Sequence, residues 1–112
     1  MKRKENSKEK SNEFKFYGDI TLEEIFNLHQ ITIYDNVVDA ISANYKDKSI
    51  NEIKIVSITL NNIEYNINLS RSKYISGLEN AIILYEKSET YEKCQLCLNI
   101  INELKNKAEV IK

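Results

Sequence analysis

The segment Ile53–Leu69, IKIVSITLNNIEYNINL, is the part of the sequence that decides the fold. In its second half, apolar and polar residues alternate with the two-residue period of a strand that buries one face. Asn61-Asn62 stands between the two halves, and asparagine tolerates the positive φ that a type I′ turn requires at both central residues. We therefore predict a β-hairpin that turns at Asn61-Asn62.

This turn also predicts how the two strands pair. Apolar residues face one another on one side, namely Leu60 with Ile63, Ile58 with Tyr65, and Val56 with Ile67. The other side pairs Thr59 with Glu64, Ser57 with Asn66, and Ile55 with Asn68. A shift by one residue would bury the asparagines, so the register is strongly specified. Because an isolated hairpin is marginally stable, we expect the C-terminal helices to cover its apolar side.

Two helices are predicted after the hairpin. Ser70 is placed to cap a helix over about 71–87, and the segment Ser88–Thr90 separates it from a helix over about 91–107. The short link predicts antiparallel packing. Gly77 lies inside the first helix, and close approach of another backbone would explain it, with chance as the alternative. The predicted apolar faces carry Tyr74, Ile75, Leu78, Ala81, Ile82 and Tyr85 in the first helix, and Tyr91, Cys94, Leu98, Ile101 and Leu104 in the second.

The sequence before the hairpin predicts a short strand and a helix. Phe14-Lys15-Phe16-Tyr17 alternates as a strand does, and this strand would pair with the hairpin edge. Thr21 and Glu24 have capping-box spacing, in which each side chain accepts a hydrogen bond from the other residue's backbone N–H. The segment Ile20–His29 is therefore predicted to be helical. Its apolar side carries Leu22, Ile25, Phe26 and Leu28.

The segment Gln30–Tyr34 leaves two alternatives open. Its β-branched residues suit a short strand, and its position suits a continuation of the preceding helix. Asp35 is of a residue type that caps helices, so we predict a further helix over Asn36–Tyr45. The polar residues Lys46–Asn51 then form a loop into the hairpin.

Composition indicates one small globular domain. The chain has 112 residues, of which 42% are apolar and 29% charged, and its net charge is -1. No apolar run approaches the roughly 18 residues of a transmembrane helix, and the first ten residues carry no apolar stretch of a secretory signal. We expect a cytoplasmic protein with a disordered basic arm over 1–13. Residues 14–112 would form one α+β domain, in which a short antiparallel sheet packs against N-terminal helices and an antiparallel C-terminal pair.

Candidate groups for catalysis or metal binding are few. Cys94 and Cys97 form a CxxC in a predicted helix, and no second pair of cysteines or histidines completes a zinc site. His29 is the only histidine and has no nucleophile near it in sequence. The two glycines rule out a glycine-rich phosphate loop. We therefore expect no enzyme activity, no metal and no cofactor.

One group of residues suits an anion. Arg71 and Lys73 occupy the first turn of a predicted helix, where N–H groups and the helix dipole attract negative charge. Two solvated side chains would be the simpler interpretation. The basic arm adds a second source of positive charge. The candidate anion or nucleic-acid site consists of Ser70, Arg71, Ser72, Lys73, Lys2, Arg3 and Lys4.

The segment Ala81–Leu104 resembles the UVR-type helical hairpin, a protein-docking element of repair and chaperone-adaptor proteins. The resemblance rests on Tyr91-Glu-Lys-Cys94 and Ile101-Asn-Glu-Leu104. It covers less than a quarter of the chain, and Cys97-Leu98 stands where that family has an Arg-Asp pair. It implies an antiparallel helix pair and nothing further about function.

The leading hypothesis is a non-catalytic intracellular protein that acts by protein interaction or regulation, as a homodimer. An accessory or inhibitor protein of a phage or mobile element would fit the size and composition. The alternative is a nucleic-acid-binding protein that uses the arm and the Arg71/Lys73 turn, followed by an enzyme or small-ligand binder. We expect no membrane partner. Apolar residues left off the helix faces motivate self-association: Ile83, Leu84, Ile100, Val110 and Ile111.

Overall fold

The computed structural model describes residues 12–111, with the side chains of residues 12–106. Its elements in chain order are β1 (Glu13–Phe16), α2 (Leu22–Leu28), α3 (Gln30–Asn44), β2 (Glu52–Leu60), β3 (Ile63–Ser70), the 3-10 turn η1 (Arg71–Lys73), α4 (Tyr74–Lys87) and α5 (Tyr91–Ile111). The arm was predicted to be disordered over 1–13, and its residues 1–11 lie outside the described range. Glu13 already belongs to β1, so the folded domain begins no later than residue 13.

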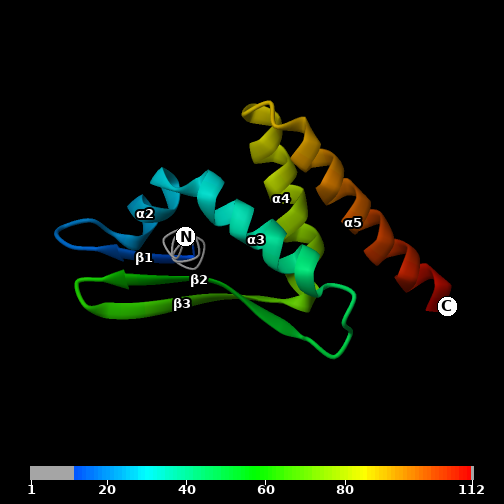
Figure 1. Cartoon of the computed structure of the whole chain (residues 1–112), viewed down its shortest axis with the longest axis horizontal. Coiled ribbons are helices and arrows are strands. Elements are labelled where there is room, and N and C mark those ends of the chain that lie inside the picture. The colour runs from blue at the N-terminus through cyan, green and yellow to red at the C-terminus, as the bar shows by residue number, and fades with distance from the viewer. Residues whose placement is uncertain (1–11, 112) are drawn as a thin grey trace, which may run out of the picture.

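The sheet has three strands. Figure 1 shows the helices on one side of it, which confirms the α+β class. The strand order is β1-β2-β3. β2 and β3 are antiparallel, but β1 pairs with β2 in parallel, so the predicted antiparallel sheet is in fact mixed. The physical reason is the connection: α2 and α3 return the chain across the sheet, as a parallel pair requires.

The hairpin has the predicted turn and, over most of its length, the predicted register. Asn61 and Asn62 have φ values of 50° and 70°, and Leu60 faces Ile63. The pairing is as predicted from there to Val56 and Ile67, but a β-bulge follows, so that Lys54 rather than Ile55 faces Asn68. The extra residue in β2 lets Ile55 and Val56 both be buried, at 3% and 0% exposure.

The capping box of α2 is confirmed. The Thr21 hydroxyl accepts from the Glu24 N–H at 3.1 Å, and the Glu24 carboxylate accepts from the Thr21 N–H at 2.9 Å. Within α2, Ile25 is fully buried, but Leu28 is exposed, contrary to the predicted apolar side.

The helix α3 begins directly after His29, so the segment Gln30–Tyr34 is helical and Asp35 does not cap a helix. Burial decides this: side chains at helical spacing along the whole of α3 face the core, which outweighs the local β-branched preference. These residues are Ile33, Val37, Val38 and Ile41.

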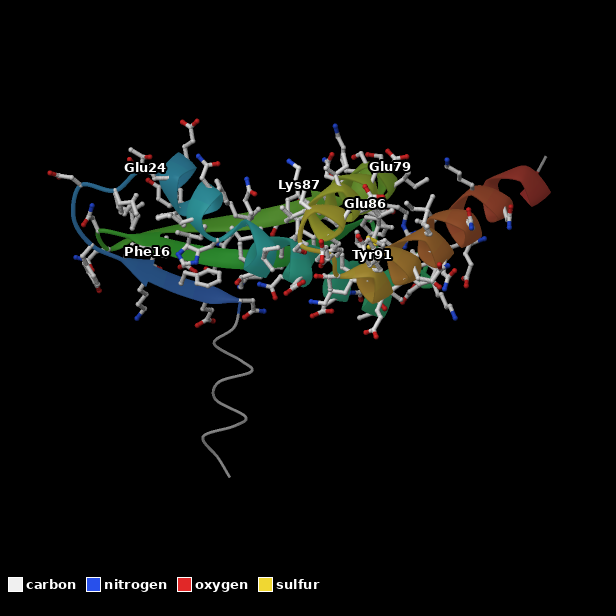
Figure 2. All side chains as sticks on the ribbon, turned by 90° about the horizontal axis from the view of Figure 1, so that it is seen from above. Phe16, Glu24, Glu79, Glu86, Lys87 and Tyr91 are labelled. Atoms are coloured by element: carbon white, nitrogen blue, oxygen red, sulfur yellow. The ribbon has the colours of Figure 1, made fainter. Side chains whose placement is uncertain are left out.

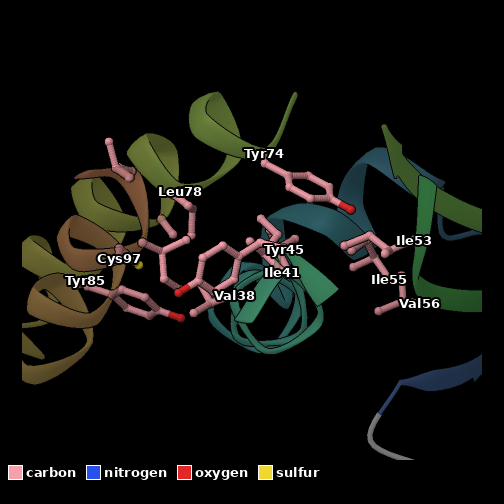
Figure 3. Close-up of a cluster of buried hydrophobic side chains, with 14 of the residues drawn as sticks. Val38, Ile41, Tyr45, Ile53, Ile55, Val56, Tyr74, Leu78, Tyr85 and Cys97 are labelled. Carbon is pink, nitrogen blue, oxygen red and sulfur yellow. The ribbon is translucent and has the colours of Figure 1, made fainter. Parts of the chain in front are cut away.

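The helix that covers the sheet is α3, and not the C-terminal pair as predicted. α3 packs against β2 on one side and α4 on the other, and α5 packs on α4 (Figure 1). Seen from above, α5 runs beyond the end of the sheet (Figure 2). Side chains from α3, α4 and β2 meet in one core, shown in Figure 3.

The buried face of α5 agrees with the predicted one only in part. Tyr91 and Leu98 are 62% and 43% exposed, whereas Cys97 and Ile100 are buried. The face that packs on α4 follows a row with three- and four-residue steps. Of the predicted residues, Tyr91 and Leu98 lie on its flank, and the other three belong to the row. This row consists of Cys94, Cys97, Ile100, Ile101 and Leu104.

The start of α4 also departs from expectation. The Ser70 side chain makes no capping hydrogen bond, because the three-residue turn η1 precedes the helix. A methyl group at Gly77 would lie 3.5 Å from a Val37 side-chain carbon and 3.6 Å from one of Leu69, which are ordinary contacts. No backbone approaches closely, so that explanation of Gly77 is wrong.

Candidate protein-interaction surface

The two edges of the sheet differ in how well they are protected against pairing. β1 is only four residues long and carries Glu13 and Lys15. β3 is eight residues long, has no lysine or proline, and carries one charged residue, Glu64. Short strands, charges and proline are the means by which proteins keep an edge from pairing with another chain. β3 therefore lacks the protection that β1 has.

The backbone groups at the β3 edge can be assigned from the register. Leu60 and Ile63 flank a two-residue turn and form a hydrogen-bonded pair, so odd-numbered residues of β3 bond to β2. The Arg71 N–H continues this alternation by donating to the Asn51 carbonyl at 2.7 Å. Within residues 12–111, β2 is the only strand that pairs with β3. The residues that direct their N–H and C=O groups outward are Glu64, Asn66 and Asn68.

On the helix side of the sheet, β3 is less covered than β2. Val56 and Ile58 of β2 are 0% exposed, because α3 lies over them. The corresponding residues Tyr65, Ile67 and Leu69 of β3 are only half-buried. Ile63, next to the turn, is 57% exposed. A row of apolar side chains is thus left partly open along the free edge.

A cleft of about 400 Å³ adjoins the far end of this row, between α3, the end of β3 and the start of α4. Its polar residues are uncharged amides and hydroxyls, including Gln30, Asn68 and Asn80. A groove of about 240 Å³ shares Gln30 and Asn80 and continues along α4 to Lys87. The cleft suits apolar groups that carry no charge. Its apolar lining consists of Phe26, Ile33, Val37, Ile55, Ile67 and Leu69.

The other face of the sheet is polar, and Ser57 lies at its centre between two acceptors. Ser57 is 5% exposed, and its hydroxyl lies 2.9 Å from a Glu64 carboxylate oxygen and 3.0 Å from the Asn66 side-chain oxygen. Glu13 and Lys15 of β1 line a shallow hollow of about 360 Å³ beside it. Charges of both signs occur there, so this face selects no particular charge.

The structure gives Arg71 a role that the sequence did not predict. Its guanidinium donates to the carbonyl oxygens of Ile50 at 2.8 Å, Tyr45 at 3.2 Å and Asp47 at 2.5 Å. It also lies 5.1 Å from the centre of the Tyr74 ring. Arg71 therefore fastens the loop between α3 and β2 to the start of α4. Its fork of N–H donors is directed into the protein.

The other described residues of the predicted anion site lie at the surface. Ser70, Ser72 and Lys73 are exposed, and the Lys73 carbonyl accepts from the Ser76 hydroxyl at 3.1 Å. Lys2, Arg3 and Lys4 lie outside the described residues. Nucleic-acid binding thus stays a prediction that depends on Lys73 and the arm.

The candidate catalytic groups take part in packing. The His29 ring lies 5.8 Å from the Phe14 ring and 5.5 Å from the Phe16 ring, so it fills the space between β1 and the helices. Burial raises the pKa of the Cys97 thiol to about 11 and also raises the pKa of Cys94. A neutral thiol is a poor nucleophile and metal ligand. In the described residues, no three His, Cys, Asp or Glu side chains cluster as metal ligands.

One polar cluster was missed entirely at the level of sequence. The Asp35 carboxylate accepts from the Tyr85 hydroxyl at 2.6 Å and from the Lys93 ammonium at 2.9 Å. Burial and this carboxylate raise the pKa of Tyr85. The three residues come from α3, α4 and α5, and no local pattern links them. They join the three helices at one end of the core.

Comparison with known proteins does not identify a relative. No family model matches the chain. The curated proteins contain no significant match. The solved structures contain none either. Among the described residues, no helix has the length and apolar character needed to cross a lipid bilayer.

Proposed function

We propose that this protein is a non-catalytic interaction protein, of a regulatory kind, that binds an extended polypeptide segment along the free edge of β3. The observation that carries the proposal is the unprotected edge beside a partly open apolar row. Strand addition to an exposed sheet edge is a general mode of peptide recognition, in which main-chain bonds give affinity and pockets give specificity.

The chemistry of the edge defines what it would bind. The outward N–H and C=O groups of Glu64, Asn66 and Asn68 would pair with the backbone of the added segment. Alternate side chains of that segment would then extend the row of Tyr65 and Ile67 and enter the cleft. Because the cleft has uncharged lining, those side chains should be apolar and neutral.

The non-catalytic part of the proposal rests on how the reactive groups are used. His29 is packed against two phenylalanine rings, and Cys94 and Cys97 are buried in the helix pair. None of them lines the cleft beside β3. The surface has the character of a docking edge, with backbone groups and apolar side chains and without a chemical centre.

The test is peptide binding measured with two variants at one position. The probe is a panel of fluorescent nine-residue peptides with apolar residues at alternate positions, compared with peptides of the same composition in clustered order. Asn66→Pro removes an outward N–H but no backbone hydrogen bond to β2. Both Asn66→Pro and Asn66→Thr lose the side-chain amide that accepts from the Ser57 hydroxyl, and only Asn66→Thr keeps the N–H.

The expected result is that alternating peptides bind the unmodified protein and the Asn66→Thr variant. Clustered peptides should bind neither, and Asn66→Pro should lose binding while its circular dichroism spectrum stays that of a folded protein. Binding that is equal for both peptide orders, or that survives the proline, would refute the proposal, as would failure of every peptide in the panel to bind the protein at a concentration where it is monomeric.

A further inference from the structure

We infer that the segment that occupies the β3 edge is the β3 strand of a second copy of this chain, paired antiparallel about a two-fold axis at Asn66. This inference rests on the proposed function and names its partner. It is argued from the direction of the backbone groups, from the side-chain pattern of Ile63–Leu69, and from the positions of the exposed isoleucine and the cleft.

The backbone limits the registers that two β3 strands can adopt. In an antiparallel ladder, residues with outward N–H and C=O groups must face residues of the same kind. With the axis at Asn66, this residue faces Asn66 of the second copy, and Glu64 faces Asn68 of the second copy. Every outward residue from Glu64 to Asn68 then has a hydrogen-bonding partner.

The side chains in this register are complementary on both faces. On the helix side, Tyr65 faces Ile67 of the second copy and Ile63 faces Leu69 of the second copy, so apolar residues meet apolar residues. On the other side, the Glu64 carboxylate faces a neutral asparagine, and no like charges face one another. Cross-strand pairs of this kind stabilise a ladder, whereas facing like charges destabilise it.

Other two-fold registers are poorer. An axis at Glu64 would place two carboxylates directly opposite each other. An axis at Tyr65 or Ile67 would leave Leu69 or Ile63 without a facing apolar residue. The sequence IEYNINL is thus symmetric in its apolar and polar pattern about Asn66, and only about that residue.

The exposed end of each strand also meets the cleft of the other copy. Ile63 is 57% exposed at one end of β3, and the cleft is lined by Ile67 and Leu69 at the opposite end. The axis at Asn66 carries Ile63 of each copy to Leu69 of the other. The same surface supplies the protruding group and the cavity, as a two-fold interface requires.

The result would be a continuous sheet across both copies, with β1 strands at its outer edges and all helices on one face. The only unprotected edge in the described part of the chain is then covered. The edges that remain are the short, charged β1 strands.

The first test is the mass in solution, measured by light scattering over a range of concentrations. The unmodified protein should approach twice the 13.1 kDa of one chain. Ile63→Thr keeps a β-branched residue but removes the apolar contact, and should raise the dimer dissociation constant by at least about tenfold. Leu98→Gln on α5, at a residue 43% exposed, is the matched control and should leave the constant unchanged.

The second test is the register, measured by disulfide formation under mild oxidation. The Asn66→Cys variant should cross-link to itself, because facing Cα atoms in an antiparallel pair lie within the range of a disulfide. Glu64→Cys mixed with Asn68→Cys should cross-link only with each other. Thr59→Cys, on the same face but in β2, is the control and should give no cross-link, while the native cysteines are buried.

Two results would overturn the inference. One is a monomer at all concentrations. The other is a dimer whose dissociation constant is unchanged by Ile63→Thr and in which the Asn66→Cys variant gives no cross-link. These results can be told apart from failure of the proposed function. If a monomeric protein binds alternating peptides and Asn66→Pro abolishes that binding, the edge binds a segment of another protein, and only pairing with a second copy is excluded.

Discussion

Replacement of Arg71 should lower the free energy of unfolding of the protein. Arg71→Ala removes hydrogen bonds to the carbonyls of Tyr45, Asp47 and Ile50, and the stacking on Tyr74. A hydrogen bond from a charged donor contributes about 1.5–3 kcal/mol when buried. Arg71 is only partly buried and the freed carbonyls can regain water, so we expect a total loss of about 3 kcal/mol.

The Arg71→Lys variant tests whether the positive charge of Arg71 or the geometry of its guanidinium group stabilises the protein. The lysine keeps the positive charge, but a single ammonium cannot reach three carbonyls spread over the loop or stack flat on an aromatic ring. We expect this variant to lose about 2 kcal/mol. Lys73→Ala is the control, because Lys73 is exposed in the same turn and its side chain makes no hydrogen bond or ion pair within the described residues.

The measurement is urea unfolding followed by circular dichroism. For a domain of this size the free energy changes by about 1.5 kcal/mol per molar urea, so the midpoint should fall by about 2 M for Arg71→Ala. The control should shift it by less than about 0.3 M. If the urea midpoint of Arg71→Lys equals that of the unmodified protein, Arg71 does not hold the loop between α3 and β2 in place. Arg71 would then again be a candidate anion ligand.

Three further predictions concern the core. The Tyr74 hydroxyl is buried, has no hydrogen-bond partner in the described residues, and points toward Ile53 and Ile55 (Figure 3). Tyr74→Phe should therefore raise the free energy of unfolding by about 1 kcal/mol and the melting temperature by about 5 °C. A lower melting temperature would show that the hydroxyl is bonded. Gly77→Ala should add roughly 1 kcal/mol, since the methyl group meets only ordinary contacts; destabilisation in urea would contradict this. Burial raises the pKa of Tyr85 and of Cys97 in the folded state, so their contribution to stability is complete below about pH 9 and declines as the pH rises above it. The melting temperature, measured from about pH 7 to about pH 11, should therefore stay level and then fall. The fall should be less steep in Tyr85→Phe. An equally steep fall in that variant would show that Tyr85 does not contribute to it.

Local patterns predicted the features that depend on neighbours in sequence. The alternation of Ile63–Leu69 and the two asparagines were sufficient for the turn and most of the register, because a slip would bury polar side chains. Thr21 and Glu24 were sufficient for the start of α2. Each of these features is formed within a few residues, so the information lies in one short stretch.

Most of the remaining features depend on contacts between distant segments. The bulge at Ile55 was missed although the sequence carries a signal for it. Apolar residues alternate at 53 and 55 and then at 56, 58 and 60, so the alternation shifts by one residue at Ile55-Val56. For Gln30–Tyr34 the choice between strand and helix stayed open, because the burial of Ile33 on α3 depends on contacts with distant segments. Arg71 was predicted to bind an anion because nothing in its neighbourhood shows that the loop after α3 folds back onto it.

The candidate interaction surface was predictable only in part. The sequence identified a hairpin with one polar row, and it suggested self-association from apolar residues on the helices. It did not identify β3 as the free edge, because strand order depends on where Phe14 and Phe16 pair. The available signal was the composition of Ile63–Leu69, which lacks the lysine and proline that usually protect an edge.

The parallel position of β1 has a consequence for how the chain assembles. Glu13 pairs with Ser57, so β1 leaves the ribosome long before its partner strand exists, and Phe14 and Phe16 stay exposed in the meantime. Because β2 and β3 are joined by a two-residue turn, whereas β1 pairs with a strand far along the chain, we expect the hairpin to form before β1 docks. Until β1 docks, the edge of β2 is also unpaired, so a nascent chain would present two edges with which the strand of another chain could pair.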